Sequence, residues 1–207
     1  MSGARRLGLL GGTFDPVHVG HLDAADAACA ALGLDGVLML PSSDPPHRPL
    51  DPRATAFHRF AMLALAIDGR PGYRVSDLEL RRSGPSYTVD TLRALHADGW
   101  RAPELFFILG ADAFADIATW HEHPAVLACA NFVVVMRPGA PAARDVARST
   151  AAGVTGIYHV EARTRDVSST AIRARLAAGQ AIDDLVPAAV ARHIAAHGLY
   201  RQDRSDA

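Results

Sequence analysis

Two histidines three positions apart, His18 and His21, are the residues of this sequence best suited to chemistry. They follow Gly11 and Gly12, which end an apolar run, and apolar residues at helical spacing begin with Leu22. This order is typical of a strand, a loop and a helix. Glycines leave room for a ligand beside the backbone, and the amides of a helix's first turn attract an anion. If the helix begins near position 19, both imidazoles face that anion, for which phosphate is the natural candidate.

The surrounding sequence excludes several other kinds of phosphate site. The Gly-x-Gly-x-x-Gly spacing of dinucleotide-binding proteins is missing, and so is the Gly-x-x-x-x-Gly-Lys-Ser/Thr loop. All 21 basic residues are arginine and none is lysine, which excludes mechanisms that need a lysine clamp or a Schiff base. Imidazole and guanidinium groups must therefore supply the positive charge.

Length and composition narrow the class of protein. With 207 residues and 49% hydrophobic content, we expect a single domain over residues 1–207. The formal net charge of −1 disfavours general binding to nucleic acid or to an anionic membrane, and two cysteines are too few for a disulfide framework. No apolar run approaches the ~20 residues of a membrane helix and no signal segment begins the chain, so we expect a cytoplasmic protein.

Apolar, β-rich segments alternate with helical patterns along the chain. The expected strands are Arg6–Leu10, Gly36–Leu40, Tyr73–Asp77, Glu104–Leu109, Phe132–Met136 and Gly156–Val160. The expected helices are Thr55–Asp68, Thr88–Ala97 and Ala111–Ile117, followed by a helical region from Ser169 to Ala196 within a C-terminal subregion of about residues 168–200. The alternation predicts an α/β fold with a doubly wound parallel sheet, in which ligands bind beyond the carboxyl ends of the strands.

A proline-rich stretch over residues 41–52 directly follows the second expected strand. Its prolines exclude a helix interior or a central strand, so we expect a stiffened loop. His47 and Arg48 favour a substrate-binding loop over a linker, although the sequence does not say whether the loop closes on a substrate.

A second candidate anion site lies near the other end of the chain. Ser168, Ser169 and Thr170 stand at an expected helix start, where hydroxyl groups commonly cap the helix. Arg173, one turn further on, favours a larger role, because a guanidinium can bind phosphate oxygens in a bidentate manner beside the helix amides.

Two further candidates follow expected strands. Asp112 comes after Gly110, where its carboxylate either accepts hydrogen bonds from ribose hydroxyls or caps the next helix. Arg137 follows the strand that ends at Met136, where a cationic side chain could reach a phosphate.

Taken together, these motifs resemble the HIGH-motif nucleotidyltransferases, and among them the bacterial nicotinate-nucleotide adenylyltransferases. The resemblance runs over nearly the whole chain, and its two end motifs are Gly11–Leu22 and Ser168–Arg173. The matching middle segments are Pro45–Arg48, Ser86–Thr91, Leu109–Asp112 and Trp120–His121. Position 48 is often lysine in relatives, and arginine there keeps the charge with a different contact geometry.

The resemblance implies a Rossmann-like nucleotidyltransferase that transfers the adenylyl group of ATP to nicotinate mononucleotide and releases pyrophosphate, a step of NAD biosynthesis. The implied catalytic residues are His18, His21 and Arg173. The implied ATP-binding residues are Gly11, Gly12, Thr13, Phe14, Gly110, Asp112, Ser168, Ser169 and Thr170. The expected substrate-binding residues are His47, Arg48, Tyr87, Thr88, Trp120 and Arg137, among which Tyr87, Thr88 and Trp120 would surround the nicotinate base. Without the resemblance, Trp120 would be interpreted as a core aromatic.

The expected ion is Mg²⁺, bound mainly through the phosphates of ATP, and we expect no protein metal ligand. His18 and His21, with His121 and His123 elsewhere, do not favour zinc, because the His-Glu-x-x-His pattern is absent.

Other functions remain open at this point. The acceptor could instead be nicotinamide mononucleotide or phosphopantetheine, or the protein could be a non-catalytic nucleotide sensor. A fragment of an aminoacyl-tRNA synthetase is disfavoured, because the chain has no lysine for the second motif of those enzymes. The sequence decides neither the formation of a homo-oligomer nor the preference for nicotinate over nicotinamide.

Overall fold

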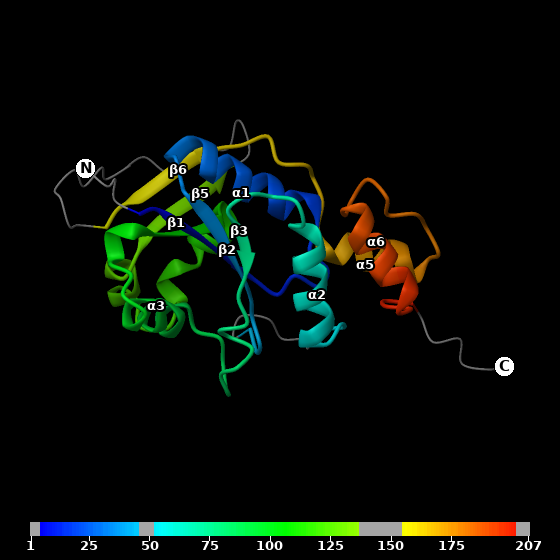
Figure 1. The fold of residues 1–207 in the computed structure, drawn as a ribbon, viewed down its shortest axis with the longest axis horizontal. Helices are drawn as coiled ribbons and strands as arrows, with labels where there is room; N and C mark the ends of the chain where they lie inside the picture. The colour runs from blue at the N-terminus through cyan, green and yellow to red at the C-terminus, as the bar shows by residue number, and fades with distance from the viewer. Residues whose placement is uncertain (1–4, 46–51, 137–154, 202–207) are drawn as a thin grey trace.

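The computed structural model describes residues 5–45, 52–136 and 155–201. Six parallel strands form one sheet in the order β3-β2-β1-β4-β5-β6 (Figure 1). The strands are β1 (Leu7–Gly12), β2 (Gly36–Pro41), β3 (Tyr73–Val75), β4 (Leu105–Gly110), β5 (Asn131–Met136) and β6 (Ile157–Glu161). The strand order reverses between β1 and β4, which confirms the predicted doubly wound sheet and places the switch point beside the glycine pair.

The helices also follow the predicted pattern. They are α1 (Val19–Leu32), α2 (Ala56–Ala66), α3 (Thr88–Ala97), α4 (Ala111–Ala115), α5 (Ser169–Ala177) and α6 (Ala188–Ala196), with short 3₁₀ turns η1 (Ala102–Glu104), η2 (Ile117–Thr119) and η3 (Ala125–Ala128). Several bounds differ from the predictions. The helix predicted over Thr55–Asp68 spans Ala56–Ala66, and the strand predicted over Tyr73–Asp77 ends at Val75. The helix predicted to reach Ile117 ends at Ala115 and gives way to η2. The C-terminal helical region is two helices, because Gly179 adopts a φ of +69° and the chain turns before α6.

Helices cover the two faces of the sheet with separate hydrophobic clusters (Figure 1). On one face α1 and α2 pack with α5 and α6, and on the other α3 packs with η3. Every residue of β5 is buried, as expected for a strand covered on both sides.

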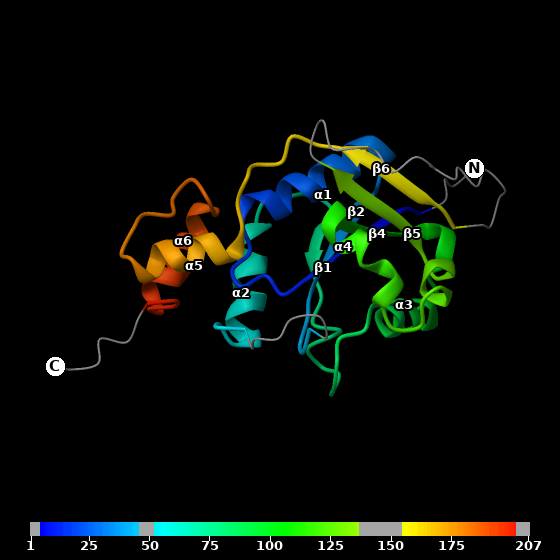
Figure 2. The same ribbon diagram turned by 180° about the vertical axis from the view of Figure 1, so that it is seen from behind.

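The C-terminal helices return to the start of the chain. They lie at one end of the molecule, beyond the start of α1, and α6 packs against α2 (Figure 2). Ser169 Oγ donates a hydrogen bond of 2.9 Å to the carbonyl of Pro16, and Val19 N donates one of 3.0 Å to Leu185 O. The two motifs at opposite ends of the sequence are therefore neighbours in space.

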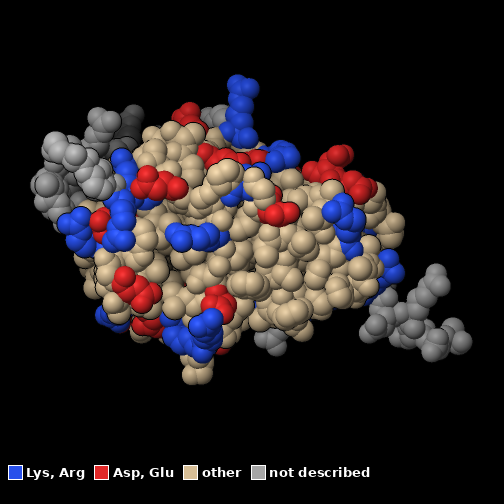
Figure 3. Space-filling view, in the orientation of Figure 1, with Lys and Arg blue, Asp and Glu red and all other residues tan. Residues whose placement is uncertain are grey.

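On the face shown in Figure 3, basic and acidic side chains intermingle around a large uncharged area, and neither charge forms a broad patch. Within the described part of the chain, no helix combines the length and apolar character needed to cross a membrane.

Candidate active site

The first motif joins β1 to α1 through a short loop. The helix begins at Val19, as predicted, and His18 is its N-cap. The backbone N–H of His18 donates to Nδ1 of His21 over 3.2 Å, and the two imidazole rings stack with centroids 3.6 Å apart. The loop therefore fixes both histidines at the amino end of a helix, where the dipole attracts an anion.

Close packing explains the glycines on either side of this loop. A Cβ atom on Gly20 would lie 3.2 Å from His18 Nδ1 and 3.3 Å from the Arg165 carbonyl, so a larger residue would displace the imidazole by a few tenths of an ångström. A Cβ on Gly12 would lie 3.1 Å from the ring of Phe14. Phe14 itself has a φ of +51°, a strained value for a bulky residue and one that is concentrated at functional sites.

A cleft of about 480 Å³ opens at the carboxyl ends of β1 and β4, next to this loop. Its polar and glycine lining comes from four segments of the chain: Gly11, Gly12, Thr13, His18, Gly20, His21, Gly110, Asp112, Thr164, Arg165 and Ser169. Asp112 is exposed in the first turn of α4, and the N-cap of that helix is Gly110, so the carboxylate is not a capping group.

A larger, open hollow of about 640 Å³ lies beside β3, but its arginine, Arg70, is already paired with Asp26 at 2.8 Å.

Burial controls the charge of His18. The side chain is only 7% exposed, and desolvation lowers its pKa from 6.5 to about 4, against the smaller opposing effect of Asp23. His18 is therefore neutral at pH 7. Its Nδ1 is buried and has no hydrogen-bond partner among the described residues. A neutral imidazole in this position can donate one hydrogen bond to a ligand without carrying a full charge.

The second motif forms the start of α5. Ser168 is the N-cap and its Oγ accepts a hydrogen bond of 3.1 Å from the backbone of Ala171, so its hydroxyl has the capping role. Ser169 lines the cleft. Arg173 does not line the cleft: its guanidinium donates to the carbonyl of Asp15 over 2.7 Å and to Thr170 Oγ1 over 3.2 Å.

Arg173 instead lines an adjacent basic hollow of about 450 Å³. Arg53, Thr170, Tyr200 and Arg201 share this lining, so three arginines border the hollow. Consecutive residues of α5 border the two: Ser169 lines the cleft and Thr170 lines the hollow. The structure thus brings the two motifs together, with Arg173 held against the loop that carries the histidines.

Three residues that the sequence analysis did not select hold this loop. Arg59 is 2% exposed and donates to the carbonyls of Thr13 (2.9 Å) and Ser42 (2.7 Å), although desolvation lowers its pKa. The carboxylate of Asp15 accepts the backbone N–H groups of residues 53 and 54 at 2.8 and 3.0 Å. Tyr200 donates its hydroxyl to Asp15 over 2.7 Å. An arginine inside a helical pattern and a tyrosine near the end of the chain give no sequence signal for these contacts.

The predicted base-binding residues lie apart from the cleft lining, at the start of α3 and beside η2. Thr88 is the first residue of α3 and Tyr87 is its N-cap, and the Tyr87 ring stacks on His121 with centroids 4.1 Å apart. Trp120 packs edge-on against Phe107 and Phe132 of the sheet.

Three predicted substrate-binding residues cannot be placed. His47, Arg48 and Arg137 lie outside the described residues, as does half of the proline-rich loop, residues 46–51.

The fold and the paired motifs define a nucleotidyltransferase, and residues 9–175 match the family model described as cytidylyltransferase-like. A relative from Bordetella petrii, named as a probable nicotinate-nucleotide adenylyltransferase, is 45% identical over 95% of this chain and 100% of its own length. One of the same name from Roseiflexus is 44% identical over 94% of this chain and 98% of its own. The chain belongs to the nicotinate-nucleotide adenylyltransferase family.

A solved structure shares the fold. The nicotinic acid mononucleotide adenylyltransferase of Plasmodium falciparum, complexed with NaAD, superposes with a TM-score of 0.72 at 18% identity, covering 95% of this chain and 97% of the other. At that identity the likeness concerns the fold alone, and it agrees with the predicted Rossmann-like nucleotidyltransferase architecture.

Proposed function

We propose that this protein transfers the adenylyl group of ATP to nicotinate mononucleotide, giving nicotinate adenine dinucleotide and pyrophosphate, in NAD biosynthesis. One observation carries the proposal: His18, His21 and the first turn of α5 converge at the switch point of a parallel sheet. Membership of the adenylyltransferase family supports the same reaction.

In this proposal the nucleoside of ATP lies at the β1 end of the cleft and the triphosphate points toward the start of α5. The nucleoside lies over the backbone of Gly11 to Phe14, with Asp112 accepting hydrogen bonds from ribose hydroxyls. The α-phosphate then sits at the two imidazoles, at the amino end of α1. The β- and γ-phosphates extend past Ser169 and Thr170 into the basic hollow, where Arg173 binds them.

The residues suit a reaction that needs alignment and charge stabilisation. A phosphate oxygen of the mononucleotide attacks the α-phosphorus of ATP, a new P–O bond forms, and the bond to the β-phosphate oxygen breaks to release pyrophosphate. The attacking oxygen is already anionic, so no general base is required. His18 and His21 donate to the oxygens where negative charge grows, and Arg173 stabilises the departing pyrophosphate.

The donor set of the cleft suits Mg²⁺ carried by ATP. Asp112 is the single acidic residue in the lining that the structure describes, which is too few carboxylates for a protein cage. Bound to the phosphate oxygens and water, the ion would neutralise part of the triphosphate charge without a protein ligand of its own.

The nicotinate base is proposed to bind at the start of α3. The aromatic rings of Tyr87 and Trp120 provide faces for a flat ring, and the amides that begin α3 suit its carboxylate. His47, Arg48 and Arg137 stay predictions for the rest of the mononucleotide. A cytoplasmic location and a homo-oligomeric assembly likewise stay predictions.

The test is a pyrophosphate-release assay with ATP and Mg²⁺, run in parallel with nicotinate mononucleotide, nicotinamide mononucleotide and phosphopantetheine. The proposal requires release that depends on nicotinate mononucleotide and exceeds the release seen with either alternative. Faster release with another acceptor would reassign the substrate. Tight ATP binding without release for any acceptor would identify a sensor instead of an enzyme.

A further inference from the structure

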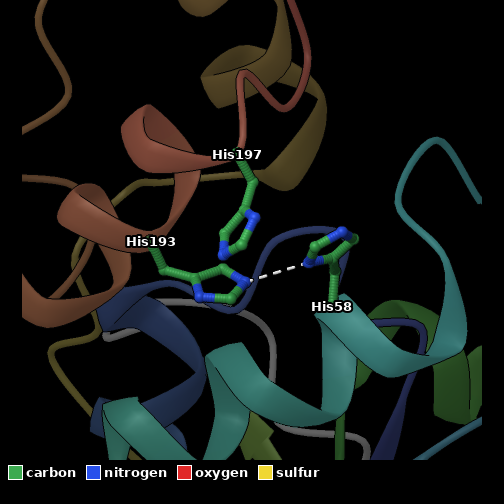
Figure 4. Close-up of side chains that lie close together, drawn as sticks. All are labelled: His58, His193 and His197. Carbon is green, nitrogen blue, oxygen red and sulfur yellow. Dashed lines mark hydrogen bonds between the residues drawn. The ribbon is translucent and has the colours of Figure 1, made fainter.

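Three histidines from two helices meet outside the proposed active site. His58 lies on α2, His193 on α6, and His197 at the carboxyl end of α6. Each offers one ring nitrogen, and these atoms all lie within 4.8 Å of one another. Figure 4 shows the three rings turned toward one another in the space between the helices. The proposed reaction uses none of them.

The helices themselves create this arrangement. His193 and His197 are four positions apart, so they project from the same side of α6. Two histidines at this spacing on one helix are a familiar zinc-binding pair. The third ring comes from α2, against which α6 packs, so the cluster depends on regular structure and not on a loop.

The distances suit a shared ion. His58 Nδ1 and His193 Nε2 lie 3.1 Å apart, joined by a hydrogen bond whose direction depends on the tautomers. Two nitrogens bound to one tetrahedral zinc, each at about 2.0 Å, lie about 3.3 Å from each other. The ring nitrogen of His197 lies within 4.8 Å of the other two, and because this side chain is exposed it is free to make the small rotation that closes the remaining gap.

Metal binding requires neutral imidazoles. Protonation would place positive charges side by side, whereas a divalent ion would use all three lone pairs at once. Imidazole ligands without thiolates favour zinc and its neighbours cobalt, nickel and copper.

We propose that His58, His193 and His197 bind one divalent transition-metal ion, of which Zn²⁺ is the representative, with a fourth position open to water. The ion ties the C-terminal helix to α2. Arg59, the next residue after His58, holds the loop after β1, and Tyr200, three positions after His197, reaches Asp15 in that same loop. The site therefore fastens the C-terminal region to the nucleotide-binding end of the sheet.

Metal titration of the full chain tests this inference without any turnover of ATP. The protein carries no polyhistidine tag, is treated with a chelator, and is titrated with Zn²⁺ by calorimetry and with Co²⁺ by visible absorption. We expect one equivalent to bind per chain, and Zn²⁺ at about 100 times its Kd to raise the Tm by about 5 °C or more.

Variants assign the ion to the cluster. His197→Ala removes an exposed ligand and should weaken Zn²⁺ binding by about 100-fold or more, and His58→Gln should do the same. His123→Ala, a change to an exposed histidine outside the cluster, should bind Zn²⁺ as the parent does.

Two results would overturn the inference: no saturable binding of one equivalent by the parent, or equal affinity in the parent and His197→Ala. In either case the cluster is only a hydrogen-bonded contact between two helices. Because His197 is exposed, its variant is expected to fold, and circular dichroism checks this. A failed adenylyl-transfer assay leaves these results unaffected.

Discussion

Acidification is predicted to destabilise the folded protein through His18. The side chain is 7% exposed, and burial holds its pKa at about 4 instead of the ordinary 6.5. As the pH falls below 6.5, the unfolded chain takes up a proton at this residue while the folded chain stays neutral until about pH 4. The stability due to His18 is therefore complete above pH 6.5 and is lost progressively between pH 6.5 and pH 4.

The size of the effect follows from these two pKa values. At about 1.4 kcal/mol per pH unit, the full difference corresponds to about 3 kcal/mol, of which about 2 kcal/mol is lost at pH 5. Urea unfolding of the parent and of His18→Gln at pH 8 and pH 5 measures it. The parent should lose about 2 kcal/mol more than the variant between these pH values. Other histidines, including His193, contribute to both proteins and cancel in the difference.

Nuclear magnetic resonance of the imidazoles provides the direct check. The chain has ten histidines, and the signal missing from His18→Gln identifies the one of interest. A His18 that titrates near pH 6.5, or an equal loss of stability in the two proteins, would refute the argument from burial. Addition of an ATP analogue should raise this pKa, since phosphate stabilises the protonated ring.

Three further predictions concern the loop after β1. Arg59→Met leaves buried carbonyl groups without a donor and should reduce the free energy of unfolding by about 3 kcal/mol, measured in urea. Gly20→Ala pushes on the imidazole of His18 and should reduce kcat by about 10- to 100-fold with the fold intact; an unchanged kcat would show that the ring needs no fixed position. Tyr200→Phe removes the hydroxyl that donates to Asp15 and should cost about 1.5 to 3 kcal/mol, whereas an unchanged Tm would mean that water replaces this bond.

The fold could be predicted from the sequence because its signals are local. The bounds of α3 agree with the prediction at both ends, and α1 begins at Val19 as the histidine motif requires. Continuous apolar runs predicted strands buried on both faces, and β5 is buried throughout. The predicted helical region did not specify the break between α5 and α6, although Gly179 and Pro187 flank it.

The candidate site could be predicted only in part, because the spacing of residues along the sequence does not predict which elements contact one another. The two motifs were found from their own residues, and the structure brings them together through Ser169 and Pro16. The sequence pattern predicts that Arg59 lies on the exposed face of an amphipathic helix, yet its side chain is buried beneath the loop. His58 and His193 meet although they are 135 positions apart, so no local pattern predicts their cluster.

The central claim is that the imidazoles at the start of α1 act on the triphosphate during transfer. The most direct measurement compares kcat and the Kd for ATP in the parent, in His21→Ala and in His96→Ala, a control whose histidine bonds the Cys129 carbonyl away from the cleft. The account predicts that His21→Ala lowers kcat by about 100- to 1000-fold, while its ATP affinity stays within about threefold and the control matches the parent. Equal turnover in His21→Ala and the parent would contradict it.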